Sequence, residues 1–286
     1  MAKKNTTDTL NGGDGNKATV KAVKHKTTPK VDWSIFDSIW GLTFTGYPER
    51  KAALEKEFKR VGILDSGRFN WRFTFPSIFD NILFDVTKKQ LKHNTCMNVP
   101  VMSCAMGHYG CIKTAYELGH NFALFLEDDI RFLKDIGKLA EIFKMIPPCG
   151  DVINFDVLPS GRKWNREKYD NMVRGGTYND EFFSYYDMCG ASCYALSRKA
   201  MRAICIRYEQ SIFPADDYTS GIVNLGKDVS YYASKTAACC QVTFGKSMNV
   251  NNYGKDTLHA AYACKGLNYS DYNIKDVDDY AFGSKL

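Results

Sequence analysis

The sequence lacks several features that define whole classes of protein. None of its 286 residues lie in a run of roughly 20 consecutive apolar residues, so no transmembrane helix is expected. The lysine-rich N-terminus has no apolar segment of the kind found in signal peptides. The 10 cysteines include no Cys-x-x-Cys pair, which argues against a zinc knuckle. We therefore expect a cytoplasmic protein, of a bacterium or of a virus-infected host cell, with reduced and buried cysteines.

The positive charge is concentrated at one end of the chain. The formal net charge is +6, but residues 1–30 hold seven lysines and two acids, which leaves only +1 for residues 31–286. The first thirty residues also contain no Phe, Trp or Tyr, whereas the whole chain is 44% hydrophobic and 14% aromatic, enough for a packed core. This division predicts a disordered basic arm over residues 1–30 and a single domain over residues 31–286.

Short apolar runs alternate with segments of helical periodicity through most of the chain. Strands are expected near residues 37–44, 63–75, 122–126, 151–157 and 191–196. Helices are expected over residues 49–61, 76–93, 103–118, 133–146 and 197–208, and residues 158–182 are interpreted as a long loop. Such alternation predicts an α/β fold with a mixed, mostly parallel sheet.

The most informative chemical feature is an acidic strand end. Five apolar residues, 122–126, are followed at once by Glu127, Asp128 and Asp129. Burying unpaired carboxylates costs on the order of several kcal/mol, so these groups must face water, a cation or a charged ligand. Ligands of α/β sheets bind at the carboxyl ends of strands, which favours Mn²⁺ or Mg²⁺ held by oxygen atoms. The alternative is a solvated acidic start to the following helix.

This part of the sequence also resembles a known family. A helix that contains His108 precedes the apolar strand that ends in Glu-Asp-Asp, and this arrangement resembles glycosyltransferase family 25. That family includes bacterial lipooligosaccharide galactosyltransferases and collagen galactosyltransferases. The family has Ser before the histidine where this chain has Gly107, and Asn-Leu where Thr43 and Phe44 stand. Four further blocks follow the family's order, at residues 39–63, 151–155, 190–198 and 213–217.

The resemblance implies a GT-A fold, a nucleotide-sugar-binding Rossmann-like domain. It also implies metal-dependent transfer of a sugar, with inversion, from a donor such as UDP-galactose or UDP-glucose to a hydroxyl group. Asp129 is the first candidate for the Mn²⁺ or Mg²⁺ ligand and Glu127 the second, because strand alternation would place both on one face. Asp128 would then point away, towards a ribose or a backbone amide. Further donor-binding candidates are Thr43, Arg50 and His108.

Inversion in one displacement requires a general base on the acceptor side. Asp216 and Asp217 follow a Phe-Pro pair and are the candidates, with Asp217 preferred; a capped helix N-terminus is the alternative interpretation. Asp156, which ends its own strand, is a further candidate for the base, and His259 for a late metal ligand. Several aromatic residues are candidates for stacking on a sugar or for core packing: Trp164, Tyr178, Tyr185 and Tyr186.

Three functions fit these observations. The first is a glycosyltransferase that acts on a surface glycan such as lipopolysaccharide. The second is the same chemistry on a modified nucleic-acid base, with the basic arm binding the polymer or, equally, an anionic membrane surface. The third is a carbohydrate-binding protein with a degenerate site.

The uneven charge predicts where any affinity for polyanions lies. Deleting residues 1–30 should abolish salt-sensitive binding to duplex DNA, because each lysine–phosphate contact adds about 0.9 to the slope of log affinity against log salt. Fluorescence anisotropy at several salt concentrations measures this slope. A full-length variant with the seven arm lysines changed to Gln serves as the matched control for charge. If the shortened chain keeps the same slope, the binding surface lies in residues 31–286.

Overall fold

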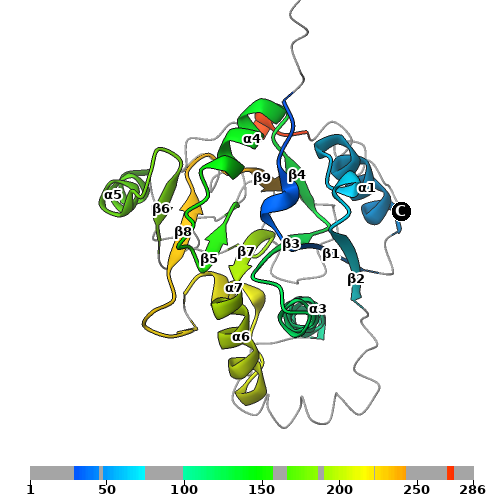
Figure 1. Ribbon diagram of the computed structural model, residues 1–286, viewed down its shortest axis with the longest axis vertical. Coiled ribbons are helices and arrows are strands. Elements are labelled where there is room, and N and C mark those ends of the chain that lie inside the picture. The colour runs from blue at the N-terminus through cyan, green and yellow to red at the C-terminus, as the bar shows by residue number, and fades with distance from the viewer. Residues whose placement is uncertain are drawn as a thin grey trace, which may run out of the picture.

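The computed structural model describes residues 29–44, 48–74, 99–156, 166–185, 190–221, 223–242 and 269–273 (Figure 1). The helices are α1 Pro48–Val61, α3 Val99–Glu117, α4 Ile136–Lys144, α5 Arg166–Gly176, α6 Arg198–Gln210 and α7 Ala215–Thr219. The strands are β1 Ser38–Phe44, β2 Phe69–Thr74, β3 Phe122–Glu127, β4 Ile130–Phe132, β5 Val152–Asn154, β6 Phe182–Ser184, β7 Cys193–Ser197, β8 Tyr231–Ser234 and β9 Cys239–Gln241.

A seven-stranded sheet forms the centre of the fold, in the order β2-β1-β3-β7-β5-β8-β6. Strands β1, β2, β3, β5 and β8 share one direction, whereas β7 and β6 run the opposite way. Strands β4 and β9 form a separate antiparallel pair. The prediction of an α/β fold with a mixed, mostly parallel sheet is therefore confirmed.

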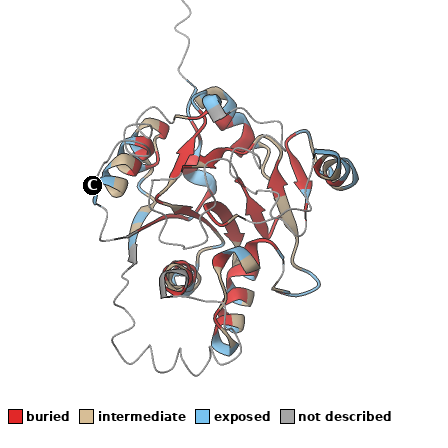
Figure 2. Cartoon of the chain, turned by 180° about the vertical axis from the view of Figure 1, so that it is seen from behind, coloured by how far each residue is buried: buried red, intermediate tan, exposed pale blue. Residues whose placement is uncertain are grey.

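Helices cover both faces of the sheet, so its central strands are buried on both sides. Along β3, Leu124 and Leu126 join the core beneath α1 and α4, while Ala123 and Phe125 face the core beneath α3 and α6. Figure 2 shows the central strands almost wholly in the colour of buried residues. This double burial explains why the sequence of β3 is a continuous apolar run rather than an alternating one.

Helix α1 packs on the sheet through a stripe of apolar side chains and ties β4 to it with one buried acid. Leu54, Phe58 and Val61 are buried, as their spacing predicts. Glu57 is also buried; its Oε1 accepts a hydrogen bond from the Phe132 amide at 2.8 Å and pairs with Arg60 at 2.6 Å. A buried carboxylate needs such partners, and here they fix the segment that follows the acidic strand end.

Most of the expected elements are present, with ends that the local hydrogen bonds explain. The helix that follows Ser197 begins there because its hydroxyl accepts a hydrogen bond from the Ala200 amide at 3.2 Å. Gly119, with φ +84, follows α3 as a left-handed C-terminal residue. The helix expected over residues 133–146 begins only at Ile136, because the Asp135 carboxylate caps it through the Lys138 amide at 3.1 Å.

The interpretation of residues 158–182 as a loop was wrong. The segment contains helix α5 and the first residue of β6. Tyr169 and Met172 lie three positions apart on α5 and are both buried, so a two-residue apolar stripe anchors an otherwise polar helix.

The helix expected over residues 76–93 lies outside the described residues, as do residues 1–28 of the expected arm. The division into an arm and one domain thus stays a prediction.

Five of the seven described cysteines are buried, in line with the expectation of buried cysteines. Cys104 is partly buried and Cys149 exposed, and the buried ones are Cys111, Cys193, Cys205, Cys239 and Cys240. Among the helices of the described segments, none combines the length and the apolar character needed to cross a membrane.

Candidate active site

The acidic residues lie where three strands of the central sheet meet. Strands β1 and β3 are parallel, with Leu42 paired to Glu127, so Thr43 and Glu127 both lie at carboxyl ends. Strand β7 is antiparallel to β3, and the Glu127 amide donates to the Ser192 carbonyl just before β7 at 2.8 Å. Asp128 and Asp129 form the turn that leads into β4. The sheet thus presents all three carboxyl groups at one edge.

Asp128 is held by two of the predicted donor-binding residues. The Thr43 hydroxyl donates to Asp128 Oδ2 at 2.9 Å, and the Arg50 guanidinium forms an ion pair with Asp128 Oδ1. The same Arg50 Nη2 lies 3.5 Å from Asp129 Oδ2. The expectation that Asp128 and Asp129 point to opposite faces was therefore wrong, because the strand ends at Glu127 and its alternation does not continue into the turn.

Asp129 combines a paired oxygen with an unpaired one. Oδ2 faces Arg50 and accepts a hydrogen bond from Gln241 Nε2 at 3.2 Å, whereas Oδ1 is buried without a hydrogen-bond partner in the part of the chain that is described. Burial, followed by the charge of Glu127, raises the pKa of Asp129 to about 8. Unsatisfied buried acceptors are rare. An oxygen of this kind beside other carboxylates fits a hard divalent cation.

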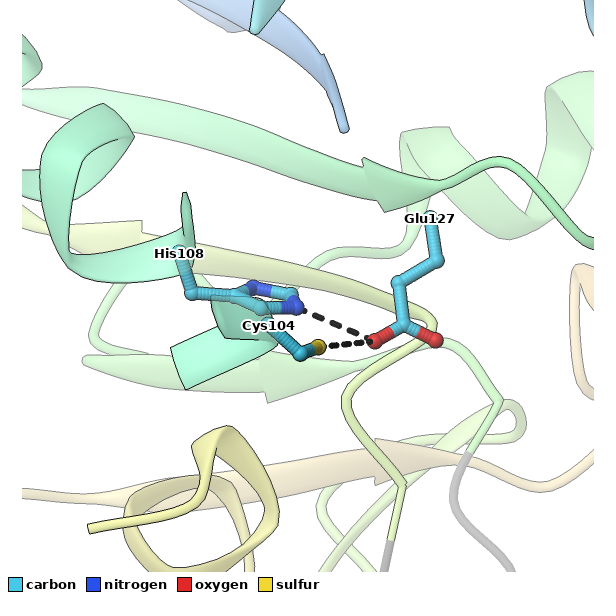
Figure 3. Close-up of side chains that lie close together, drawn as sticks. All are labelled: Cys104, His108 and Glu127. Atoms are coloured by element: carbon cyan, nitrogen blue, oxygen red, sulfur yellow. Dashed lines mark hydrogen bonds and ion pairs between the residues drawn. The ribbon is translucent and has the colours of Figure 1, made fainter. Parts of the chain in front are cut away.

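Glu127 contacts two side chains of helix α3. Its Oε1 lies 3.0 Å from His108 Nε2 and 3.6 Å from Cys104 Sγ, as Figure 3 shows. Burial acts to raise the pKa of Glu127. The hydrogen bonds from His108 and Cys104, together with the charges of His108 and Arg50, outweigh burial and lower the pKa overall. His108 is fully buried, and its Nδ1 lies 2.7 Å from the Tyr194 hydroxyl, which in turn lies 2.9 Å from the Tyr218 hydroxyl. His108 is thus fixed at both ring nitrogens.

The two candidate bases lie in the first turn of α7. Asp216 Oδ1 accepts a hydrogen bond from the Gly190 amide at 3.1 Å. Burial by surrounding protein atoms and the charge of Glu127 raise the pKa of Asp216 to about 6, although the residue keeps an exposed surface. Burial alone raises the pKa of Asp217. Asp216 therefore interacts electrostatically with Glu127 at the end of β3. No contact among the described residues decides between Asp216 and Asp217, the residue preferred from the sequence.

The remaining candidates lie in different environments. Asp156 is buried and accepts a hydrogen bond from Ser192 Oγ at 2.7 Å. Tyr185 is a buried core residue whose hydroxyl donates to the Thr219 carbonyl, whereas Tyr178 is exposed and packs edge-to-face on Tyr232. Outside the described residues lie Trp164, Tyr186 and His259.

Some residues of the site were not found from the sequence. Cys104 lies one helical turn before His108, and this spacing of four is a signal that could have linked them. Gln241 and Tyr194 carry no such signal, because their contacts with Asp129 and His108 join residues 112 and 86 positions apart.

Comparisons with known proteins give only loose neighbours. No protein family matches the sequence, and no curated protein is significantly similar to it. Among solved structures, mouse xyloside xylosyltransferase 1 in its apo form has a TM-score of 0.36 and 9% identity over 79% of this chain and 93% of its own. The galactosyltransferase LgtC with donor and acceptor sugar analogs has a TM-score of 0.35 and 9% identity over 80% of this chain and 95% of its own. Both neighbours are glycosyltransferases, but such scores carry no argument about this chain, and the resemblance to family 25 stays a prediction.

The raised pKa of Asp129 predicts a pH-dependent cost in stability when no metal is bound. An Asp pKa raised from 3.8 to about 8 means that the folded state binds more protons than the unfolded state between these values. The stability contributed by this group is therefore lost as the pH rises towards 8. In EDTA at pH 8, Asp129→Asn should melt about 2 °C or more above the wild type, and the difference should shrink towards pH 5.

Differential scanning calorimetry at both pH values measures this difference. Asp65→Asn, which changes an exposed acid away from the site, is the control and should leave the melting temperature unchanged. A melting temperature of Asp129→Asn at or below that of the wild type at pH 8 would contradict the assignment.

Proposed function

We propose that this protein is a metal-dependent glycosyltransferase with a GT-A-type site, which transfers a sugar from a nucleotide-diphosphate donor to a hydroxyl group. The observation that carries the proposal is the buried Oδ1 of Asp129, which has no hydrogen-bond partner among the described residues and lies in an acidic turn at the carboxyl ends of β1 and β3. A site that leaves a carboxylate oxygen unsatisfied in its own fold is built to receive a cation. The resemblance of the sequence to family 25 supports the same activity.

The donor side of the proposed site is the acidic turn with its basic neighbour. Asp129 and Glu127 are the residues that would hold Mn²⁺ or Mg²⁺. Such an ion supplies positive charge to the oxygens of the leaving diphosphate. Arg50 now pairs with Asp128 and Asp129. In our proposal a donor phosphate competes for this guanidinium, whose planar fork of N–H donors suits paired contacts with phosphate oxygens. Thr43 keeps Asp128 in place.

The acceptor side of the proposed site is helix α7. A single displacement forms a bond between the acceptor oxygen and the anomeric carbon while the bond from that carbon to the diphosphate breaks. The acceptor hydroxyl must give up its proton, and a base whose pKa lies near neutrality is the most effective. Asp216 has a pKa of about 6 and keeps an exposed surface, which supports it as the base.

The donor and acceptor identities are further proposals. UDP-galactose or UDP-glucose as donor and a surface glycan such as lipopolysaccharide as acceptor follow from the family resemblance. One alternative is the transfer of a sugar to a modified base of a nucleic acid, and the net charge of +5 on residues 1–30 would suit such a polymer or, equally, an anionic membrane surface.

Donor hydrolysis in the absence of acceptor tests the metal-binding assignment. With Mn²⁺ and a panel of nucleotide sugars, the wild type should release the nucleoside diphosphate from one donor, and EDTA should stop the release. Asp129→Ala should lower this rate at least about 100-fold, because the charge that stabilises the leaving group is no longer held. Asp65→Ala is the control and should keep the wild-type rate. Unchanged Mn²⁺-dependent hydrolysis by Asp129→Ala would show that the ion binds elsewhere.

The adjacent acids of α7 provide a matched pair for testing the base. Asp216→Asn should lower the rate of sugar transfer by about 100-fold to 10,000-fold, the usual contribution of a general base. Asp217→Asn, one residue away, should stay within a few-fold of the wild type. Single-turnover transfer with a saturating donor is the measurement. The reverse result would assign the base to Asp217, and full transfer by both variants would place the base outside α7.

A further inference from the structure

A second group of potential metal ligands lies on the helix side of Glu127. Cys104 and His108 stand four positions apart on α3 and so project from the same face of the helix, towards the end of β3. One ligand atom from each of Cys104, His108 and Glu127 lies within 4.8 Å of the other two (Figure 3). The group brings together a thiol, an imidazole and a carboxyl, which are the ligand types of Zn²⁺.

The two separations from Glu127 match those around a tetrahedral zinc ion. Zinc bonds of about 2.3 Å to sulfur and about 2.0 Å to nitrogen or oxygen place ligand atoms about 3.5 Å apart for S···O and about 3.3 Å for N···O. The observed separations from Glu127 Oε1 are 3.6 Å to Cys104 Sγ and 3.0 Å to His108 Nε2. An ion could therefore replace these two hydrogen bonds with shifts of a few tenths of an ångström, and the ligand atoms of Cys104 and His108 lie within 4.8 Å of each other.

The surroundings of the group favour a cation. A thiolate, a neutral imidazole and a carboxylate carry two negative charges, which one divalent ion neutralises in a place where unpaired charge is costly. The Tyr194 hydroxyl contacts Nδ1 of His108 at 2.7 Å, the kind of second contact that orients a metal-binding imidazole through its other nitrogen.

We infer that Cys104, His108 and Glu127 form a site for a borderline divalent cation, Zn²⁺, distinct from the Mn²⁺ or Mg²⁺ proposed at Asp129. Both described contacts of Glu127 with this group use Oε1, and Figure 3 shows its other oxygen on the side away from Cys104 and His108. The second oxygen of Glu127 therefore lies outside this group of three ligand atoms. Three protein ligands leave one position of a tetrahedral ion for water or another ligand.

Co²⁺ is the probe for this site, because it adopts the same geometry and absorbs light. Titrated into the full chain after treatment with a chelator and a phosphine reductant, Co²⁺ should bind one equivalent with the intense visible bands of a tetrahedral ion and a near-ultraviolet thiolate charge-transfer band. Zn²⁺ should displace it. Cys104→Ser should abolish the charge-transfer band, and Tyr194→Phe should weaken binding about 10–100-fold without changing the far-ultraviolet circular dichroism.

Two controls separate this site from other thiols and from the proposed donor site. Cys149→Ser changes an exposed cysteine elsewhere, and Asp129→Asn changes the acidic turn; both should keep the charge-transfer band. X-ray absorption of the Zn²⁺-loaded wild type needs no variant and should report one sulfur at about 2.3 Å. A wild type without the charge-transfer band, a band that survives in Cys104→Ser, or a zinc shell without sulfur would each overturn the inference. Failure of donor hydrolysis would overturn the proposed function and leave the cobalt result standing.

Discussion

The paired contacts of Arg50 with Asp128 and Asp129 are the interaction on which the site depends. The chain places three adjacent carboxyl groups at the end of a strand that is buried on both faces, and self-repulsion would oppose this arrangement. Arg50 offsets it with one positive charge, and Thr43 and Gln241 each add a hydrogen bond. The third carboxyl group, that of Glu127, pairs with His108. Burial first, and the charge of Glu127 second, raise the pKa of Asp129 to about 8.

The burial of these carboxyl groups has a structural cause. Strand β3 lies between β1 and β7, and α3 packs against its end, so the acidic turn cannot move out towards water without disturbing the central sheet. Rigid support of this kind keeps ligand groups in place. In our proposal the fold accepts a cost in stability at one edge to keep a carboxylate oxygen available, in the way that binding sites commonly trade stability for function.

How much of the structure can be predicted from the sequence depends on how far apart in the chain the interacting residues lie. The buried run of β3, the stripe of α1 and the serine cap of α6 are local patterns, and the structure confirms them. Helix α5 was missed because its apolar stripe is only two residues long within a polar segment. The opposite orientation of Asp128 and Asp129 was predicted from strand alternation, which ends with the strand at Glu127.

Contacts between distant parts of the chain lie beyond such reasoning. Gln241 reaches Asp129 only because β9 pairs with β4, and the positions of the two strands in the sequence do not indicate that pairing. Asp216 interacts with Glu127 only because α7 packs near α3, so the sequence alone could rank it no higher than Asp217. The sequence therefore predicts features that depend on neighbouring residues. It does not predict the roles of residues that meet only because the fold brings distant segments together.

Glu127 determines how cations of two kinds could share this edge of the sheet. One of its oxygens faces a thiol and an imidazole, which favour borderline ions such as Zn²⁺, and the acidic turn beyond it offers only oxygen ligands, which favour Mg²⁺ or Mn²⁺. Affinity alone would let zinc compete at both places, since it exceeds manganese in the usual order of stability. Selectivity at the acidic turn must therefore come from its oxygen-only donor set and from the availability of each metal, whereas the thiol of Cys104 makes the neighbouring site the preferred place for zinc.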